Sequence, residues 1–201
     1  MARARSACTA GVLALCLAHG APAAAQAATP AGTTATAPAS AAAADWRAAL
    51  PGARNASSTR FSVWGFDVYD ASLWVTDGFR PDNWMQRKFA LELHYLRSFD
   101  GAEIAKRSLD EMRRSGPIGP EQGGLWLQAM QASFPDVKKG DRIVGLYEPG
   151  VGARFFYNGA SSGTVRDPVF AERFFAIWLG RQTSEPAMRD ALLAPFASLA
   201  R

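Results

Sequence analysis

Cysteine and histidine are scarce in this chain. Its two cysteines are Cys8 and Cys16, and its two histidines are His19 and His94. Only His94 lies beyond the first 25 residues. Disulfides, thiol nucleophiles and zinc sites depend on cysteine or on clustered histidine. We therefore expect the main part of the chain to have no disulfide, no thiol chemistry, no metal site and no cofactor.

Long apolar runs and clusters of one charge are also missing. No stretch beyond the first 25 residues reaches the ~18 apolar residues that a membrane span needs. The chain has 22 basic and 18 acidic residues, a formal net charge of +4, and the two signs are interspersed. Basic runs with interleaved aromatic residues, which typify nucleic-acid binding, do not occur. We expect neither a membrane-spanning segment in the mature protein nor a nucleic-acid partner.

The first 44 residues differ in composition from the rest. Arg3 and Arg5 precede a short apolar stretch over residues 10–18, and small residues follow at 23–25. This order predicts a cleaved signal peptide over residues 1–25 and a periplasmic or secreted protein. Cys16 leaves lipid attachment open as an alternative, although Leu15 fits a lipoprotein site poorly. Residues 26–44 contain alanine, threonine and proline without charge, which predicts a flexible tether before one domain over residues 45–201.

The domain sequence alternates between strand and helix patterns. Trp64-Gly65 fits a two-residue turn between two aromatic-rich strands, and Asp100 with Glu103 fits a helix-capping box. The expected strands cover residues 60–63, 66–75, 89–95, 142–147, 153–157 and 163–165. The expected helices cover residues 102–114, 121–134, 168–179 and 185–193, after one helical turn at 45–50. This order predicts an α+β fold, with an antiparallel sheet covered on one face by helices.

Four segments together resemble a known family. They are Val68–Trp74, Lys139–Asp141, Tyr157–Gly159 and Phe174–Gly180. In this order they are similar to the exported bacterial branch of the chalcone isomerase-like family, over about residues 46–193. The resemblance implies an open-faced β-sandwich with a ligand cleft between the sheet and the helices. The family includes plant isomerases that close a flavanone ring, plastid proteins that bind fatty acids, and members without known chemistry, so the fold alone does not assign a function.

The resemblance also implies a ligand-binding pair on the first hairpin. In the catalytic and fatty-acid-binding branches, an arginine on one strand faces a hydroxyl residue on the next. If Trp64-Gly65 forms a two-residue turn, regular pairing places Arg60 opposite Tyr69. These two residues are our candidate ligand contacts, since a guanidinium and a phenol can share one ligand oxygen. A solvent-facing pair with Arg60 lying on the ring is the alternative, a one-residue register slip would separate the two, and Arg54 is a second candidate arginine.

The other catalytic features of the isomerases are missing. Their tyrosine and asparagine near the first central helix have no counterpart in residues 98–107, and Ile177 replaces a hydroxyl residue. His94 could act as a base, but a satisfied or surface histidine is the alternative, and we assign no catalytic residue. We expect a non-catalytic domain that binds a fatty acid or similar amphiphile. Two alternatives stay open, an isomerase or lyase for a phenolic or enone substrate and an envelope protein-interaction module.

Overall fold

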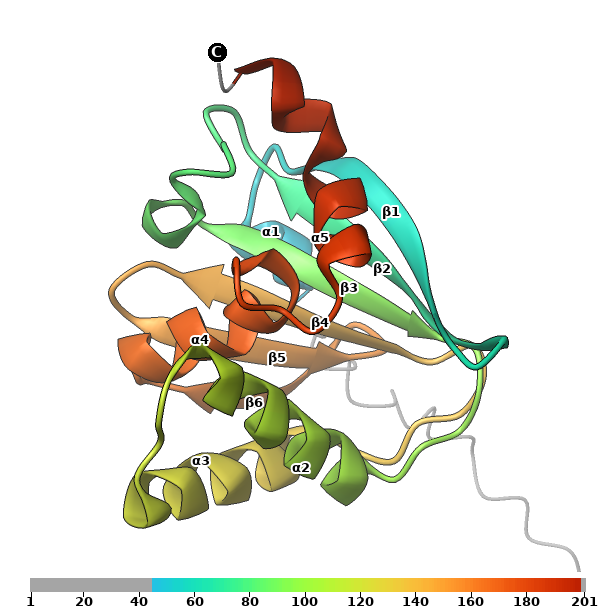
Figure 1. The fold of residues 1–201 in the computed structure, drawn as a ribbon, viewed down its shortest axis with the longest axis vertical. Helices are drawn as coiled ribbons and strands as arrows, with labels where there is room; N and C mark the ends of the chain where they lie inside the picture. The colour runs from blue at the N-terminus through green and yellow to red at the C-terminus, as the bar shows by residue number, and fades with distance from the viewer. Residues whose placement is uncertain (1–44, 200–201) are drawn as a thin grey trace, which may run out of the picture. The chain divides into compact units, whose positions relative to one another are not determined.

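The computed structural model of the chain describes residues 45–199. The predicted signal peptide and tether lie outside this range. Within it, six strands form one antiparallel sheet in the order β1-β2-β3-β4-β5-β6, so every strand pairs with its neighbours in sequence (Figure 1). The strands are β1 (Arg54–Val63), β2 (Phe66–Val75), β3 (Phe89–Tyr95), β4 (Arg142–Glu148), β5 (Gly152–Tyr157) and β6 (Ala160–Val165).

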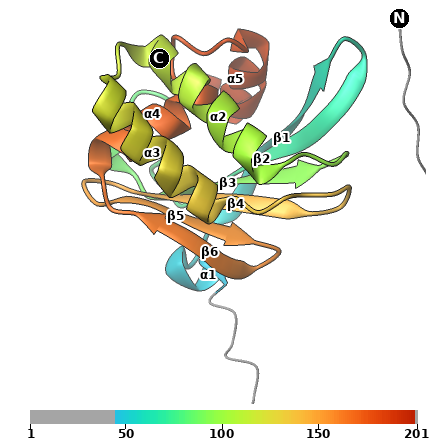
Figure 2. The same ribbon diagram turned by 90° about the horizontal axis from the view of Figure 1, so that it is seen from below.

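Helices cover mainly one face of this sheet. They are α1 (Trp46–Ala49), α2 (Gly101–Met112), α3 (Pro120–Ser133), α4 (Pro168–Leu179) and α5 (Pro186–Leu193), with 3-10 turns at Trp84–Gln86, Arg113–Ser115 and Ala194–Leu199. Figure 2 shows α2 to α5 on one side of the sheet and the short α1 on the other. The expected α+β fold with helices on an antiparallel sheet is confirmed, and α1 adds a small second layer.

The main core lies between the sheet and helices α2 to α5. Alternation along β3 directs Phe89, Leu91, Leu93 and Tyr95 to the helical side, where all four are buried. The aromatic residues of α4 meet them there, with Phe175 against Phe89 at a centroid distance of 5.0 Å. On the far side of the sheet, Trp46 and Leu50 pack on a separate small cluster that includes Ala90, Val144, Leu146 and Phe156.

The β1–β2 hairpin is regular at its turn and irregular just behind it. Trp64 and Gly65 both have positive φ, 49° and 81°, as a type I′ turn requires. Val63 pairs with Phe66 and Ser62 with Asp67, as expected. A bulge then intervenes, so that Phe61 pairs with Tyr69 and Arg60 pairs with Asp70. Val68 is the additional residue on β2, and the register expected beyond the turn is wrong.

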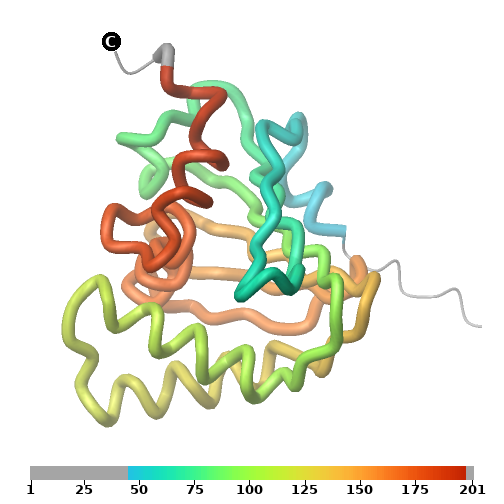
Figure 3. Tube along the Cα trace, turned by 45° about the vertical axis from the view of Figure 1, so that its right-hand side comes forward, coloured from blue at the N-terminus to red at the C-terminus, as the bar shows by residue number. Residues whose placement is uncertain are grey.

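The start of α2 also differs from the expectation. Asp100 occupies the N-cap position, but its side chain makes no capping hydrogen bond. Asp136 accepts a hydrogen bond from the Gly101 backbone N–H at 2.8 Å instead. A Cβ at Gly101 would lie 2.1 Å from the Phe134 carbonyl oxygen, so α2 begins pressed against the end of α3. The predicted capping box is therefore wrong, because a carboxylate from a distant segment takes its place. The trace in Figure 3 shows the resulting antiparallel pair of α2 and α3.

Two of the family-like segments meet at Asp141. This buried carboxylate accepts hydrogen bonds from the Lys138 backbone N–H (2.9 Å), the Tyr157 hydroxyl (2.8 Å) and the Asn158 amide (3.0 Å). The bonds from Asn158, Lys138 and Tyr157 lower the pKa of Asp141. Asp141 thus ties the end of β5 to the turn before β4, which is a structural role.

Candidate functional site

A cavity lies between the sheet and the helices, on the side toward the β1–β2 hairpin. Its volume is about 320 Å³, at the lower end of the ~300–1,000 Å³ typical of small-molecule sites. Figure 2 shows the hairpin curving toward the helical side, and residues of both the hairpin and α2 line the cavity. The cavity is lined by Phe61, Val68, Tyr69, Leu93, Tyr95, Phe99, Glu103, Ile104, Arg107, Ser108, Glu111, Phe134, Ile143, Phe174, Ile177, Trp178, Ser184, Glu185 and Met188.

Most of this wall is aliphatic or aromatic. Leu93 and Ile143 come from the sheet, Phe174 and Ile177 from α4, and Phe134 from the end of α3. The aromatic and aliphatic surfaces would hold an apolar body without offering it hydrogen bonds. A lining of this kind, with a few polar groups, is typical of sites for small hydrophobic molecules.

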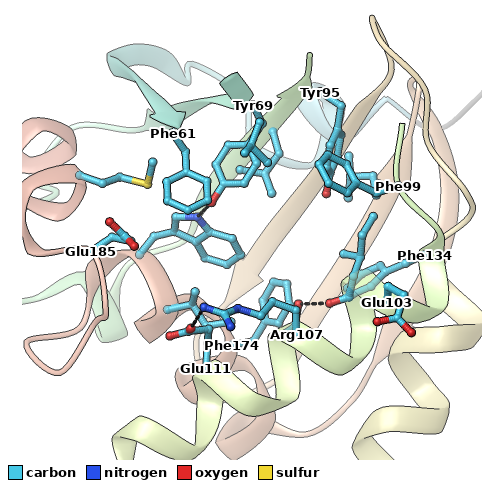
Figure 4. Close-up of a pocket in the computed structure, with 18 of the residues that line it drawn as sticks. Phe61, Tyr69, Tyr95, Phe99, Glu103, Arg107, Glu111, Phe134, Phe174 and Glu185 are labelled. Carbon is cyan, nitrogen blue, oxygen red and sulfur yellow. Dashed lines mark hydrogen bonds and ion pairs between the residues drawn. The ribbon is translucent and has the colours of Figure 1, made fainter. Parts of the chain in front are cut away.

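Two phenols are the main polar groups on the sheet side of the cavity. Tyr69 and Tyr95 are cross-strand partners whose rings lie 6.0 Å apart, and both point from the sheet into the cavity (Figure 4). The Tyr69 hydroxyl accepts a hydrogen bond from Trp178 Nε1 at 3.1 Å. The Tyr95 hydroxyl has no hydrogen-bond partner within residues 45–199. Both phenolic protons therefore remain to be donated.

Both phenols are protonated at physiological pH, as an ordinary tyrosine is, and burial shifts their pKa further upward. It raises the pKa of Tyr69 above its usual range, and the hydrogen bond from Trp178 opposes this rise only in part. Burial raises the pKa of Tyr95 likewise, with a further contribution from neighbouring Tyr69. Neutral hydroxyls are donors rather than bases at physiological pH. The pair is thus suited to hold a hydrogen-bond acceptor.

Charged side chains gather along α2 and before α5 at the edge of the cavity. Glu103, Arg107 and Glu111 come from α2, and Glu185 precedes α5 (Figure 4). Arg107 Nη2 lies 2.6 Å from Glu111 Oε1; the Arg107 side chain is 73% exposed, whereas that of Glu111 is 11% exposed. The other Glu111 oxygen, Oε2, is buried without a hydrogen bond in the described part of the chain.

The predicted pair of Arg60 and Tyr69 does not form. Because of the bulge, Arg60 lies on the face of the sheet opposite to Tyr69, and it does not line the cavity. Its guanidinium binds Asp70 at 2.7 Å and Asp67 at 2.8 Å, and the Asp70 hydrogen bond raises the pKa of Arg60. The expected geometry was therefore wrong for Arg60, while Tyr69 does face the cavity. The ligand-binding role of Tyr69 stays a prediction.

The other residues considered from the sequence fall outside or at the edge of the site. Arg54 is exposed at the start of β1, and His94 lies between Asp70 and Arg142 on the outer face. Neither lines the cavity. Ile177 does line it, so this wall is apolar where the isomerases carry a hydroxyl group.

Tyr95 and Trp178 were not predicted from the sequence as polar contributors to the site. The available signal for Tyr95 was a phenol at the end of an otherwise apolar alternating row in residues 89–95. Trp178 could not be connected with Tyr69 from local sequence, because their contact spans 109 positions. Arg107 and Glu111 could not be recognised as cavity residues from the sequence, since charged residues on a helix are usually solvated.

Within the described range, no group of three or more histidine, cysteine or acidic side chains is placed to hold a metal ion. Residues 45–199 also contain no helix of the length and apolarity required to cross a bilayer.

Comparisons with known proteins agree with this architecture. The crystal structure of a fatty-acid binding protein from Arabidopsis thaliana has a TM-score of 0.59 to this chain at 15% identity, and the match covers 75% of this chain and 91% of that one. At this identity the likeness concerns the fold. No curated protein matches the sequence significantly. The sequence profile described as chalcone isomerase-like matches residues 53–194, most of the domain. The chain therefore belongs to the chalcone isomerase-like family.

Proposed function

We propose that the domain is a non-catalytic binding protein for one small, largely apolar amphiphile, such as a fatty acid or a molecule of similar shape. The observation that carries this proposal is the apolar cavity of about 320 Å³ with two phenols inside it. An apolar body would lie against the side chains of α2 and α4. The polar end of the ligand would meet Tyr69 and Tyr95.

The fold similarity supports a binding role. The Arabidopsis thaliana structure is that of a fatty-acid binding protein, and it shares the sheet-and-helix arrangement that encloses the cavity here. We extend from that protein only the general idea of an enclosed amphiphile, because one fold carries different functions.

The two alternatives predict different cavities. An interaction module with a vestigial cleft would have the space filled by side chains, whereas this cavity is open. An isomerase would need groups that orient and activate a phenolate, and Ile177 together with two protonated phenols does not supply them. We expect no absorbance change when the protein is mixed with a panel of chalcones; turnover above the uncatalysed rate would favour the isomerase.

We also propose that the mature domain acts outside the cytoplasm. The support is the charged, apolar and small-residue order of residues 1–25. N-terminal sequencing of the protein from the periplasm or medium of an expressing bacterium should find a start close to residue 26. Retention of Met1 in cytoplasmic protein would contradict this proposal.

The binding proposal can be tested by blocking the cavity. Ile104 lines the cavity from α2, and Ile104→Trp should fill part of the space that a ligand needs. We expect the unaltered protein to carry extractable lipid or to bind the neutral fluorescent probe N-phenyl-1-naphthylamine, and the variant to lose at least tenfold in probe affinity.

The matched control is Leu125→Trp. Leu125 lies on α3, 56% exposed and away from the cavity, so the same substitution should leave probe binding unchanged. Equal binding by both variants, or an unaltered protein that neither carries nor binds any amphiphile, would contradict the proposed function.

A further inference from the structure

We infer that the cavity selects a ligand whose polar head is an uncharged hydrogen-bond acceptor, such as a ketone or ester carbonyl, rather than an ionised carboxylate. This inference rests on the proposed function and narrows it, because an ionised fatty acid then binds more weakly than an uncharged amphiphile of similar shape. Its basis is the imbalance between hydrogen-bond donors and positive charges around the cavity.

The donors are two phenols on neighbouring strands. Tyr69 already accepts a hydrogen bond from Trp178, so its own proton is directed to a further partner. Tyr95 is 3% exposed as a residue, and its hydroxyl makes no hydrogen bond to another group of residues 45–199. This hydroxyl is not among the fully enclosed polar atoms that lack a partner, so it is open to the cavity and can donate to a ligand there. One carbonyl oxygen has two lone pairs and could accept from one or both phenols, whose rings are cross-strand neighbours.

Positive charge for an anionic head is lacking. Arg60, the residue expected to supply it, lies on the other face of the sheet with Asp67 and Asp70. Arg107 is the one cationic side chain in the cavity lining of residues 45–199, and it is largely exposed and paired with Glu111. An ionised carboxylate placed near the phenols would lose its hydration without gaining a cation.

The carboxylates at the edge of the cavity also disfavour an anionic ligand head. Glu103, Glu111 and Glu185 all line it, against the single Arg107. Glu111 already has ion pairs with Arg107 at 2.6 Å and Arg114 at 3.8 Å, whereas Glu103 and Glu185 have no ion pair in residues 45–199. An anionic head would therefore meet repulsion mainly from Glu103 and Glu185, whereas an uncharged head would not.

A pair of ligands of nearly equal shape tests the inference. Dodecanoate and 2-tridecanone share an undecyl chain and a carbonyl, and differ in having O⁻ or CH₃ beside it. Tridecane serves as the ligand without a polar group. Displacement of N-phenyl-1-naphthylamine at pH 7.5 would measure the affinity of the protein for each of the three ligands. We expect 2-tridecanone to bind at least tenfold more tightly than dodecanoate.

Variants separate head-group recognition from the apolar contribution. Tyr95→Phe should weaken the binding of 2-tridecanone by about three- to tenfold, the usual net effect of one hydrogen bond, and leave the affinity for tridecane unchanged. Tyr69→Phe should also weaken the binding of 2-tridecanone. Tyr147→Phe is the matched control, because that buried hydroxyl donates to the Met85 carbonyl at 2.9 Å and does not line the cavity; it should leave all three affinities unchanged.

The outcomes distinguish this inference from the proposed function. Binding of dodecanoate more tightly than the ketone, with loss of that preference in Arg107→Gln or Arg60→Ala, would overturn the inference while the binding function stands. Equal loss of ketone and alkane binding in Tyr95→Phe would also overturn it. Failure of all three ligands to displace the probe would contradict the proposed function, and the inference with it.

Discussion

Asp141 shows how one side chain can hold two segments of this fold together. Its carboxylate receives three hydrogen bonds, and these lower its pKa relative to the unfolded chain. A carboxylate of lowered pKa stabilises the folded state fully above its unfolded pKa, about 3.9 for aspartate. This stabilisation is lost as the pH falls through the lower, folded pKa.

We therefore expect the stability of the protein to fall as the pH drops below about 4, and Asp141→Asn to weaken that dependence. The variant should also be less stable at pH 7, because an amide cannot accept all three bonds as the carboxylate does. Urea unfolding at several pH values would measure both effects. Asp82→Asn is the control, since the Asp82 side chain is 74% exposed. An unchanged pH profile in Asp141→Asn would show that other carboxylates control acid unfolding.

Among the individual residues of the candidate site, only some could be predicted from the sequence. Tyr69 was identified from a segment shared with the family, and it does face the cavity. Arg60 was placed by assuming regular pairing behind the turn, and one additional residue in β2 moves it to the other face. A bulge depends on how both strands pack on the rest of the sheet, so local sequence does not disclose it.

The β1–β2 hairpin is the element with the most unusual turn. Trp64 has φ of 49° and is 95% exposed, although glycine, asparagine and aspartate are the residues that favour this conformation. A left-handed conformation costs a bulky residue about 1–2 kcal/mol. The turn was nevertheless predicted correctly, because Gly65 follows and strand-like residues flank both.

Replacing Trp64 should consequently stabilise the hairpin. We expect Trp64→Asn to raise the free energy of unfolding by about 1 kcal/mol, since Asn-Gly suits a type I′ turn. Thermal unfolding should show a midpoint about 2–4 °C higher. Phe66→Asn is the comparison, because Phe66 is also exposed but does not have positive φ. Equal stabilisation by both substitutions would indicate that apolar exposure, and not turn geometry, is responsible.

Strand β1 was only partly anticipated. It begins at Arg54, whereas the sequence predicted a start at Arg60. Residues 54–59 are polar except for Ala56 and lack apolar alternation, because β1 is an edge strand that is exposed or half-buried there. Its position is fixed in part by a distant element, as Ser57 donates a hydrogen bond to the Leu192 carbonyl of α5 at 2.6 Å.

For the whole domain, the sheet separates two apolar clusters of different size. The larger one surrounds the cavity, and the smaller one lies under α1. The order of strands and helices was readable from periodicity and turn residues, because each strand pairs with its neighbour in sequence. Which face α1 covers was not readable, since one helical turn carries too little pattern.

This division predicts that stability and ligand binding can be changed separately. Trp46 is buried in the smaller cluster, with its ring 5.3 Å from that of Trp74. We expect Trp46→Ala to lower the free energy of unfolding by about 3–5 kcal/mol, while folded protein keeps its affinity for N-phenyl-1-naphthylamine. Urea unfolding and probe titration would measure the two, with exposed Leu125→Ala as the control. Loss of probe affinity in folded Trp46→Ala would show that the clusters are coupled.

The position of α1 has a practical consequence. Asp45 caps this helix on the outer side of the sheet, so a label or solid support joined directly to Asp45 is attached on the side away from the cavity. Such an attachment should leave the cavity unobstructed, whereas a bulky group fixed to the inner face of α2 would lie against the cavity lining.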